Sequence, residues 1–215
     1  MEIIFCDNHL LIVSKPAGLS TQPHEGSNTS LLEQAKAWVK KEFQKPGNVF
    51  LEPVHRLDKP VSGLVLFART SKALSRLQEM MREHQIEKTY FAWVEGSLPQ
   101  KKGTLEHYLV HDEYKARVVN ASHREGKIAR LHYLQLDQKK DRSLVEIRLE
   151  TGRYHQIRVQ FSAIDCPVAG DSKYGNNPAV KNEKISLHSG RLKFFHPVTK
   201  DPLSFEQIPA DYTPR

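Results

Sequence analysis

The sequence has little cysteine and no long apolar run. Only two of its 215 residues are cysteines, Cys6 and Cys166, which excludes a disulfide-stapled fold and a cysteine-rich zinc site. No stretch approaches the roughly 20 apolar residues of a membrane-spanning helix. Glu2 and Asp7 interrupt the first apolar segment, which also lacks the basic start and the cleavage site of a secretory signal. We therefore expect a cytoplasmic protein that has no membrane partner.

Acidic residues are also fewer than basic ones. The chain has 25 acidic and 32 basic residues, a net charge of +7, and its hydrophobic fraction of 39% is ordinary for a globular protein. The basic excess is concentrated in residues 115–130, with five basic residues and one acidic, and in residues 171–200, with six and two. This surplus fits a polyanionic partner and a merely solvated surface equally well.

The hydrophobic pattern predicts many strands and few helices. Short apolar or alternating runs predict strands at residues 3–5, 10–13, 64–68, 89–95, 129–136 and 143–150. Helical spacing predicts helices that begin near Leu31, after the capping-box residues Ser30 and Glu33, and near Ser71, with a third over residues 154–164. Because strands and helices do not alternate regularly, the fold class is predicted to be α+β with a mostly antiparallel sheet.

Length predicts one domain over residues 1–215. Within this domain, the fraction of apolar residues drops at residues 100–103, which is the one candidate boundary between subdomains. The spacing of His107 and His111 would suit two metal ligands on a helix, but no third ligand accompanies them. We expect both to be ordinary histidines and the protein to hold no metal.

Residues 54–63 carry the most unusual cluster of charges. They bring a histidine, an arginine, an aspartate and a lysine together, and a proline and a glycine mark the segment as a loop. If its backbone is extended, Arg56 and Asp58 point to one side while His55 and Leu57 point to the other. From the residues alone, this is either a catalytic pocket on a loop or a surface turn with a local ion pair.

Several short motifs occur in a fixed order along the chain. They are Lys15-Pro16-Ala17-Gly18, His55-Arg56-Leu57-Asp58 with Ser62-Gly63, Lys88-Thr89-Tyr90, residues 151–158, Gly170-Asp171 with Tyr174-Gly175, Leu187-His188 and His196-Pro197. Each motif is weak by itself, but together and in order they resemble the RluA-type pseudouridine synthases. The resemblance covers nearly the whole chain.

The resemblance implies an enzyme that converts uridine in RNA to pseudouridine without a metal or an organic cofactor. It implies a curved, mixed, mostly antiparallel sheet with helices around a central cleft. Asp58 matches the essential aspartate, which either adds to the sugar or takes a proton from it. Tyr90 would stack on the flipped base, and Arg158 would pair with Asp58 and keep it ionised.

The same resemblance suggests residues that bind the RNA. Arg56 would enter the space that the extruded uridine leaves, and Ile157 would form an apolar floor beside Asp58. Lys15, Arg153 and Lys173 are candidate phosphate contacts. Two of these residues also have a purely structural interpretation. Tyr90 could be an ordinary aromatic residue of a strand, and Ile157 could pack in the hydrophobic core.

The chain departs from the family pattern at residues 159–161, where Val159-Gln160-Phe161 replaces a common basic or histidine-containing continuation. It departs in two further ways. Pro60-Val61 stands where an aspartate and a threonine are common in the family. We also expect a protein without the S4-like module of many relatives, in which the catalytic domain's own surface recognises the RNA. Ribosomal and transfer RNA both suit such a protein, with a monomer as the expected state. Two alternatives are an inactive RNA-binding protein on the same scaffold and a small-molecule hydrolase that uses an Asp–Arg pair.

Overall fold

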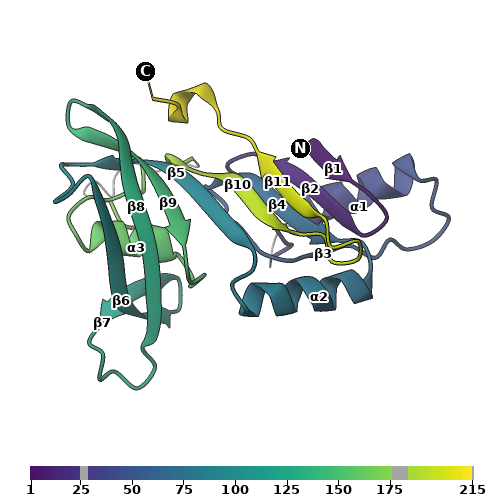
Figure 1. Cartoon of the computed structure of the whole chain (residues 1–215), viewed down its shortest axis with the longest axis horizontal. Coiled ribbons are helices and arrows are strands. Elements are labelled where there is room, and N and C mark those ends of the chain that lie inside the picture. Colours follow the sequence, from purple (N-terminus) through teal and green to yellow (C-terminus); the bar gives the residue numbers. More distant parts are fainter. Residues whose placement is uncertain (25–28, 176–183, 215) are drawn as a thin grey trace. The chain divides into compact units, whose positions relative to one another are not determined.

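The computed structural model describes residues 1–24, 29–175 and 184–214 (Figure 1). The chain divides into two compact units. Unit 1 comprises Met1–Glu87 and Ser189–Gln207, and unit 2 comprises Lys88–His188 and Ile208–Arg215. The boundary therefore lies after Glu87 rather than at residues 100–103, which belong to unit 2. A single catalytic domain over the whole chain stays a prediction.

Unit 1 contains six strands, counted over the described residues. In spatial order these include β1 (Glu2–Cys6), β2 (Leu10–Lys15), β4 (Ser62–Ala68) and β10 (Leu187–Phe195), while β3 (Glu52–Pro53) pairs with β4 and β11 (Pro202–Glu206) pairs with β10. The pairs β1–β2, β2–β4, β3–β4 and β10–β11 are antiparallel. The three strands predicted at residues 3–5, 10–13 and 64–68 are confirmed, whereas β3, β10 and β11 were not predicted.

Two capped helices accompany these strands, α1 (Leu31–Glu42) and α2 (Ser71–Arg82). The side chain of Ser30 accepts a hydrogen bond from the Glu33 backbone N–H at 3.2 Å, and this confirms the predicted N-cap. Helix α2 packs on β4 (Figure 1), where its Leu77 joins buried leucines of β2 and β4 in the core of unit 1.

Unit 2 is built on five strands, as far as the described residues go. In spatial order they are β5 (Glu87–Glu95), β9 (Arg142–Leu149), β8 (Lys127–Lys139), β6 (Lys102–Asp112) and β7 (Lys115–Val119), and each neighbouring pair is antiparallel. Helix α3 (Gln156–Ser162) contacts β6 and β7 (Figure 1). A 3₁₀ turn, η1 (Ala210–Tyr212), follows near the end of the chain. The predicted α+β class with a mostly antiparallel sheet is confirmed.

Helix α3 is shorter than the sequence predicts. His155 adopts a left-handed backbone with φ of 52°, so the helix begins only at Gln156. Tyr154, which the periodicity placed on the helix, therefore lies before it. Within the described ranges, no helix is both long enough and apolar enough to cross a membrane.

Gly63 marks a close approach of two strands in unit 1. Its φ is +116°, and an added Cβ would lie 2.3 Å from the Ser189 carbonyl oxygen of β10. A side chain here is strained by its backbone angle and collides with backbone atoms, which side-chain motion cannot relieve.

Gly63→Ala is therefore expected to lower the free energy of unfolding by at least about 2 kcal/mol, as measured by urea denaturation. Gly47→Ala is the matched control, because nothing lies within 4 Å of a Cβ there, and it should change stability by less than about 0.5 kcal/mol. Equal stability of the two variants would contradict the close approach of β4 and β10.

Candidate active site

Asp58 lies in the segment that joins β3 to β4. Side chains alternate along this segment, since His55 and Leu57 are buried while Arg56 is exposed and Asp58 is half-buried. Nε2 of His55 accepts a hydrogen bond from the Leu66 backbone N–H at 3.2 Å, which ties the segment to β4. The alternation predicted for an extended backbone is confirmed by these exposures.

The backbone on both sides of Asp58 is held by the segment that follows β2. The Thr21 hydroxyl donates to the Leu57 carbonyl oxygen at 2.9 Å and accepts from the Leu57 N–H at 3.1 Å. On the other side, the Gly18 N–H donates to the Lys59 carbonyl oxygen at 2.8 Å. The backbone is therefore anchored at Leu57 and at Lys59, on either side of Asp58, and this limits where its carboxylate can move.

Lys15 reinforces this anchoring from inside unit 1. Its side chain has no exposed surface, and Nζ donates to the carbonyl oxygens of Leu19 at 2.6 Å and of Pro16 and Lys59 at 3.1 Å each. Burial lowers the pKa of Lys15 to about 8, although the Asp58 carboxylate opposes that shift. The ammonium thus faces backbone oxygens, a position different from the exposed one that the predicted phosphate contact requires.

The Pro60-Val61 departure does not leave the loop without restraint. The Val61 N–H donates to the Asp58 carbonyl oxygen at 3.0 Å, which closes a turn around Lys59 and Pro60. The Val61 side chain is buried, and the proline ring fixes one backbone angle. Backbone hydrogen bonds and an apolar anchor therefore restrain this loop without the aspartate and threonine that are common at these two positions.

Arg158 of α3 is held by Asp171. The guanidinium Nε donates to one carboxylate oxygen at 2.6 Å and Nη2 donates to the other at 2.9 Å, in a bidentate geometry. Both side chains are almost fully buried. Burial by itself raises the pKa of Asp171, but the Arg158 guanidinium and the backbone N–H groups of Lys173 and Tyr174 outweigh it and hold this pKa below its usual range.

Tyr174 extends this arrangement to the residue before α3. The guanidinium of Arg158 lies over the Tyr174 ring at 5.1 Å, and the Tyr174 oxygen accepts a hydrogen bond from the Ala116 N–H at 2.6 Å. Burial raises the pKa of Tyr174 to about 12, so its hydroxyl keeps its proton. That proton is available to Nδ1 of His155, 2.8 Å away.

The remaining predicted residues of unit 2 have different exposures. Tyr90 on β5 and Ile157 on α3 are both buried, whereas Arg153 is exposed and its Nε donates to the Ile128 carbonyl oxygen at 3.0 Å. Lys173 donates to a backbone oxygen as well, that of Tyr114 at 2.6 Å. Arg153 and Lys173 thus already make contacts within unit 2.

The predicted site residues fall into two groups. Lys15, Arg56 and Asp58 belong to unit 1, and Tyr90, Arg153, Ile157 and Arg158 belong to unit 2. Within unit 1 the structure brings Lys15 close to the Asp58 loop, and within unit 2 it joins Arg158 to Asp171. The pairing of Arg158 with Asp58 stays a prediction.

The comparisons with known proteins assign the family. Residues 9–163 match the RNA pseudouridylate synthase family, and 98% of the chain is 35% identical to the RNA pseudouridine synthase YhcT of Bacillus subtilis, covering 70% of that protein. The chain belongs to the RNA pseudouridine synthase family. It is thus an isomerase of uridine in RNA, as the motifs predicted.

Two further comparisons agree with this family. The synthase is 32% identical to the dual-specificity RNA pseudouridine synthase RluA of Pasteurella multocida, over 98% of the chain and 94% of that protein. Among solved structures, the human RNA pseudouridylate synthase domain containing 4 has a TM-score of 0.82 over 98% of the chain and 90% of its own, at 23% identity. At that identity the structural match supports the fold, and the predicted synthase fold is confirmed.

Sequence reasoning assigned no role to three residues that contact the predicted site residues or their loop within each unit of this synthase. Asp171 and Tyr174 lie in one of the ordered motifs of the sequence, and this motif could have indicated that both residues have a role. Thr21 gave no such signal. Nothing in the sequence around this threonine indicates that its hydroxyl binds the backbone of Leu57, 36 residues later.

The two histidines with metal-like spacing lie on the strand β6, not on a helix. Nδ1 of His107 is 3.1 Å from the Nε2 of Gln160, and burial lowers the pKa of this histidine. Among the residues that the structure describes, no group of three potential ligands could hold a metal ion.

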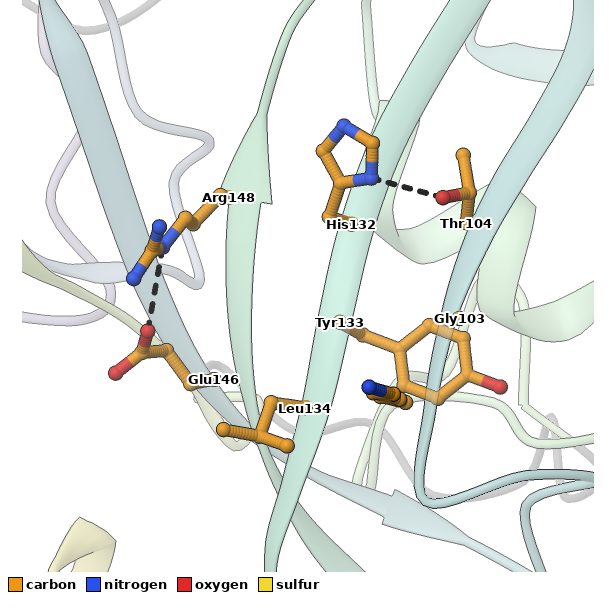
Figure 2. A pocket seen from close by; sticks show the side chains of 8 residues that line it. Gly103, Thr104, His132, Tyr133, Leu134, Glu146 and Arg148 are labelled. Carbon is orange, nitrogen blue, oxygen red and sulfur yellow. Dashed lines mark hydrogen bonds and ion pairs between the residues drawn. The ribbon is translucent and has the colours of Figure 1, made fainter.

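A pocket of about 510 Å³ opens on unit 2, on the sheet made by β6, β8 and β9 (Figure 2). Across these strands His132 faces Thr104 and Arg148, and its Nδ1 lies 2.8 Å from the Thr104 hydroxyl. Arg148 pairs with Glu146 at 3.4 Å. None of the residues predicted for catalysis or RNA binding lines this pocket, so it is separate from the candidate active site.

Proposed function

We propose that this synthase isomerises specific uridines of ribosomal or transfer RNA, with Asp58 as the catalytic group. The observation that carries the proposal is the half-buried Asp58 on a loop whose peptides are anchored on both sides. A carboxylate held in this way keeps its orientation while a reaction proceeds at the sugar. The names of the relatives supply the candidate RNAs, since they include large-subunit ribosomal synthases and a dual-specificity enzyme.

The chemistry needs one carboxylate and no redox partner. The bond between N1 of uracil and C1′ of ribose breaks, and a bond from C5 to C1′ forms, while C5 loses a hydrogen and N1 gains one. Asp58 either adds to the sugar as the first bond breaks or removes a proton from it. The substrate is neither oxidised nor reduced, so the step needs no redox cofactor. The proposal follows the family resemblance in including no organic cofactor or metal.

The other proposed roles come from the family resemblance, and the exposure of Arg56 supports its role. Arg56 is exposed beside Asp58, which suits a planar cation that replaces the extruded base in the RNA stack. Tyr90 stacks on the flipped uracil, Ile157 forms the apolar floor, and Arg158 pairs with Asp58. Arg153 contacts phosphate, whereas for Lys15 the buried ammonium supports a role in positioning the Asp58 loop.

A release assay tests this proposal directly. Ribosomal and transfer RNA transcripts carrying tritium at C5 of uridine are incubated with the purified protein, because the C5 hydrogen leaves when the carbon–carbon bond forms. Tritium release from at least one transcript, followed by mapping of pseudouridine in it, is the expected result. No release from either class of RNA would overturn the proposed function.

The basic stretch at residues 115–130 is the proposed phosphate contact surface of unit 2. Its exposed cations are Lys115, Arg117, Arg124 and Lys127, of which Arg117 pairs with Asp112 at 3.3 Å. The second basic stretch, residues 171–200, lies partly outside the described residues. Exposed cations on a protein that binds RNA release counterions when they meet phosphates.

Replacing Arg124 and Lys127 together by glutamine should lower the slope of log affinity against log salt by about 1 for each phosphate that these side chains neutralise in the wild type. Filter binding at several salt concentrations measures this slope. The double variant with Lys40→Gln and Lys41→Gln, two exposed lysines of α1, removes the same charge elsewhere and should keep the wild-type slope. Equal slopes in all three proteins would remove residues 124 and 127 from the RNA contact.

Neither alternative function gains support. The inactive RNA-binding scaffold was suggested by Pro60-Val61, yet the loop is restrained around an intact Asp58. The hydrolase conflicts with the family to which the chain belongs. We further propose that the protein acts as a monomer in the cytoplasm, without an obligate protein partner.

A further inference from the structure

Four aromatic rings of unit 2 follow one another in space, and two of them reach the surface. His111 at the end of β6 lies 4.1 Å from Tyr154, Tyr154 stacks on His155 at 3.8 Å and 20°, and His155 meets Tyr174 edge-on at 5.5 Å. His155 is buried, whereas Tyr154 is 39% exposed and His111 is exposed. We call these four residues the ring column.

The ring column is fixed from its buried end. His155 is held in a left-handed backbone directly before α3, and its Nδ1 meets the Tyr174 hydroxyl. Tyr174 is in turn anchored by the Ala116 and Asp171 hydrogen bonds. A ring supported in this way loses little conformational freedom when a ligand stacks on it, so stacking energy is not consumed by ordering the protein.

One cation adjoins the ring column in the chain, and two more lie on the hairpin that carries His111. Arg153 precedes Tyr154, and Lys115 and Arg117 stand on either side of Ala116 of β7, which pairs with His111 in the register of the hairpin. By strand alternation, the side chains of Lys115 and Arg117 leave the face of the hairpin opposite to His111. All three basic side chains are exposed. The hairpin also carries Asp112, paired with Arg117, and Glu113. An exposed aromatic ring on a hairpin that also carries exposed cations suits a nucleotide that is not in a duplex, because its base offers a flat face to the ring and its backbone can pass to the cations.

We propose that the outward face of His111, backed by the Tyr154 ring, forms a stacking site for an unpaired base of the RNA substrate. This base is a different one from the target uridine. This stacking site depends on the proposed function in one respect, namely that the ligand is RNA. Bases of any identity have a flat face, so this site selects for single-stranded flanks and not for a sequence. It thereby favours uridines in loops over uridines within continuous helices.

The test compares binding to a single-stranded RNA oligonucleotide with binding to its duplex. Tyr154→Ala removes the ring that backs His111 and should weaken single-strand binding by about 5-fold or more, the loss expected when the stacking of one base on an aromatic ring is abolished. Duplex binding should stay within about 2-fold. Tyr154→Phe keeps a ring and should bind like the wild type. Phe195→Ala is the matched control, because Phe195 is an exposed aromatic of unit 1, and it should change neither affinity.

Two further measurements keep the result interpretable. His111→Ala should reproduce the weaker single-strand binding, and thermal unfolding of each variant separates the removal of a ring from the loss of the fold. A 2-aminopurine base in the oligonucleotide should lose fluorescence on binding to the wild type and less on binding to Tyr154→Ala. Free uridine monophosphate, as a competitor, distinguishes a nucleotide site from one that needs an RNA strand.

Unchanged single-strand affinity in well-folded Tyr154→Ala and His111→Ala would overturn the stacking site. A Tyr154→Phe variant that binds as weakly as Tyr154→Ala would also overturn it, since the ring would not be the binding element. Tritium release from the wild-type protein reports on the proposed function separately. Its absence together with the expected binding losses would refute the isomerisation of these RNAs and leave the stacking site intact.

Discussion

Replacing Asp58 by asparagine is expected to lower isomerisation by about 10⁴-fold or more, while the protein stays folded. The amide has nearly the shape of the carboxylate but can neither attack the sugar nor accept a proton from it. The loop should keep its place, because the restraints around it come from the backbone of Leu57 and Lys59 and from Thr21.

Tritium release from C5-labelled RNA measures this loss, and binding to the same RNA shows whether recognition persists. Glu52→Gln on the neighbouring strand β3 makes the same chemical change in the same unit and should leave turnover unchanged. Turnover near the wild-type rate in Asp58→Asn would exclude Asp58 from catalysis.

The second large effect is expected at Asp171. Asp171→Asn leaves the buried Arg158 guanidinium without its anionic partner, and breaking such a pair costs about 3–5 kcal/mol of unfolding free energy. Denaturant unfolding at neutral pH measures the loss. Asp112→Asn is the control, because the Asp112–Arg117 pair is largely exposed and should cost less than about 1 kcal/mol.

The cost of Asp171→Asn should also depend on pH. The folded protein holds the pKa of Asp171 below its ordinary value of 3.8, so the unfolded chain takes up a proton first as the pH falls. The stabilisation is therefore complete above about pH 5 and is lost as the pH falls through the folded-state pKa. The difference between wild type and variant should shrink below about pH 4, and a constant difference down to about pH 2 would contradict a depressed pKa.

Elements that depend on nearby residues were predictable from the sequence. The start of α1 follows from Ser30, whose side chain accepts the hydrogen bond of the Glu33 backbone N–H in the first turn. The exposures of Arg56 and Asp58 follow from strand alternation, which needs only an extended backbone. The ordered motifs also identified the family correctly, because they encode chemistry more than packing.

Elements that depend on distant residues were not predictable. Periodicity placed Tyr154 on a helix, but the left-handed backbone of His155 delays the start of that helix to Gln156. No strand was predicted at residues 102–112, where pairing with β7 and β8 forms β6. The bidentate partner of Arg158 is set by where the chain returns after α3, and no local pattern contains that information.

The way in which the Asp58 loop is held has a consequence for mutational tolerance. The restraints on this loop come largely from backbone groups, which do not depend on the identity of the side chain. The residues at positions 59 and 60 can therefore be substituted without moving the Asp58 carboxylate. Thr21 has no such freedom, because its hydroxyl holds both polar groups of the Leu57 backbone. A saturation scan for activity should therefore find position 21 much less permissive than position 59, although position 59 adjoins the catalytic aspartate in the chain.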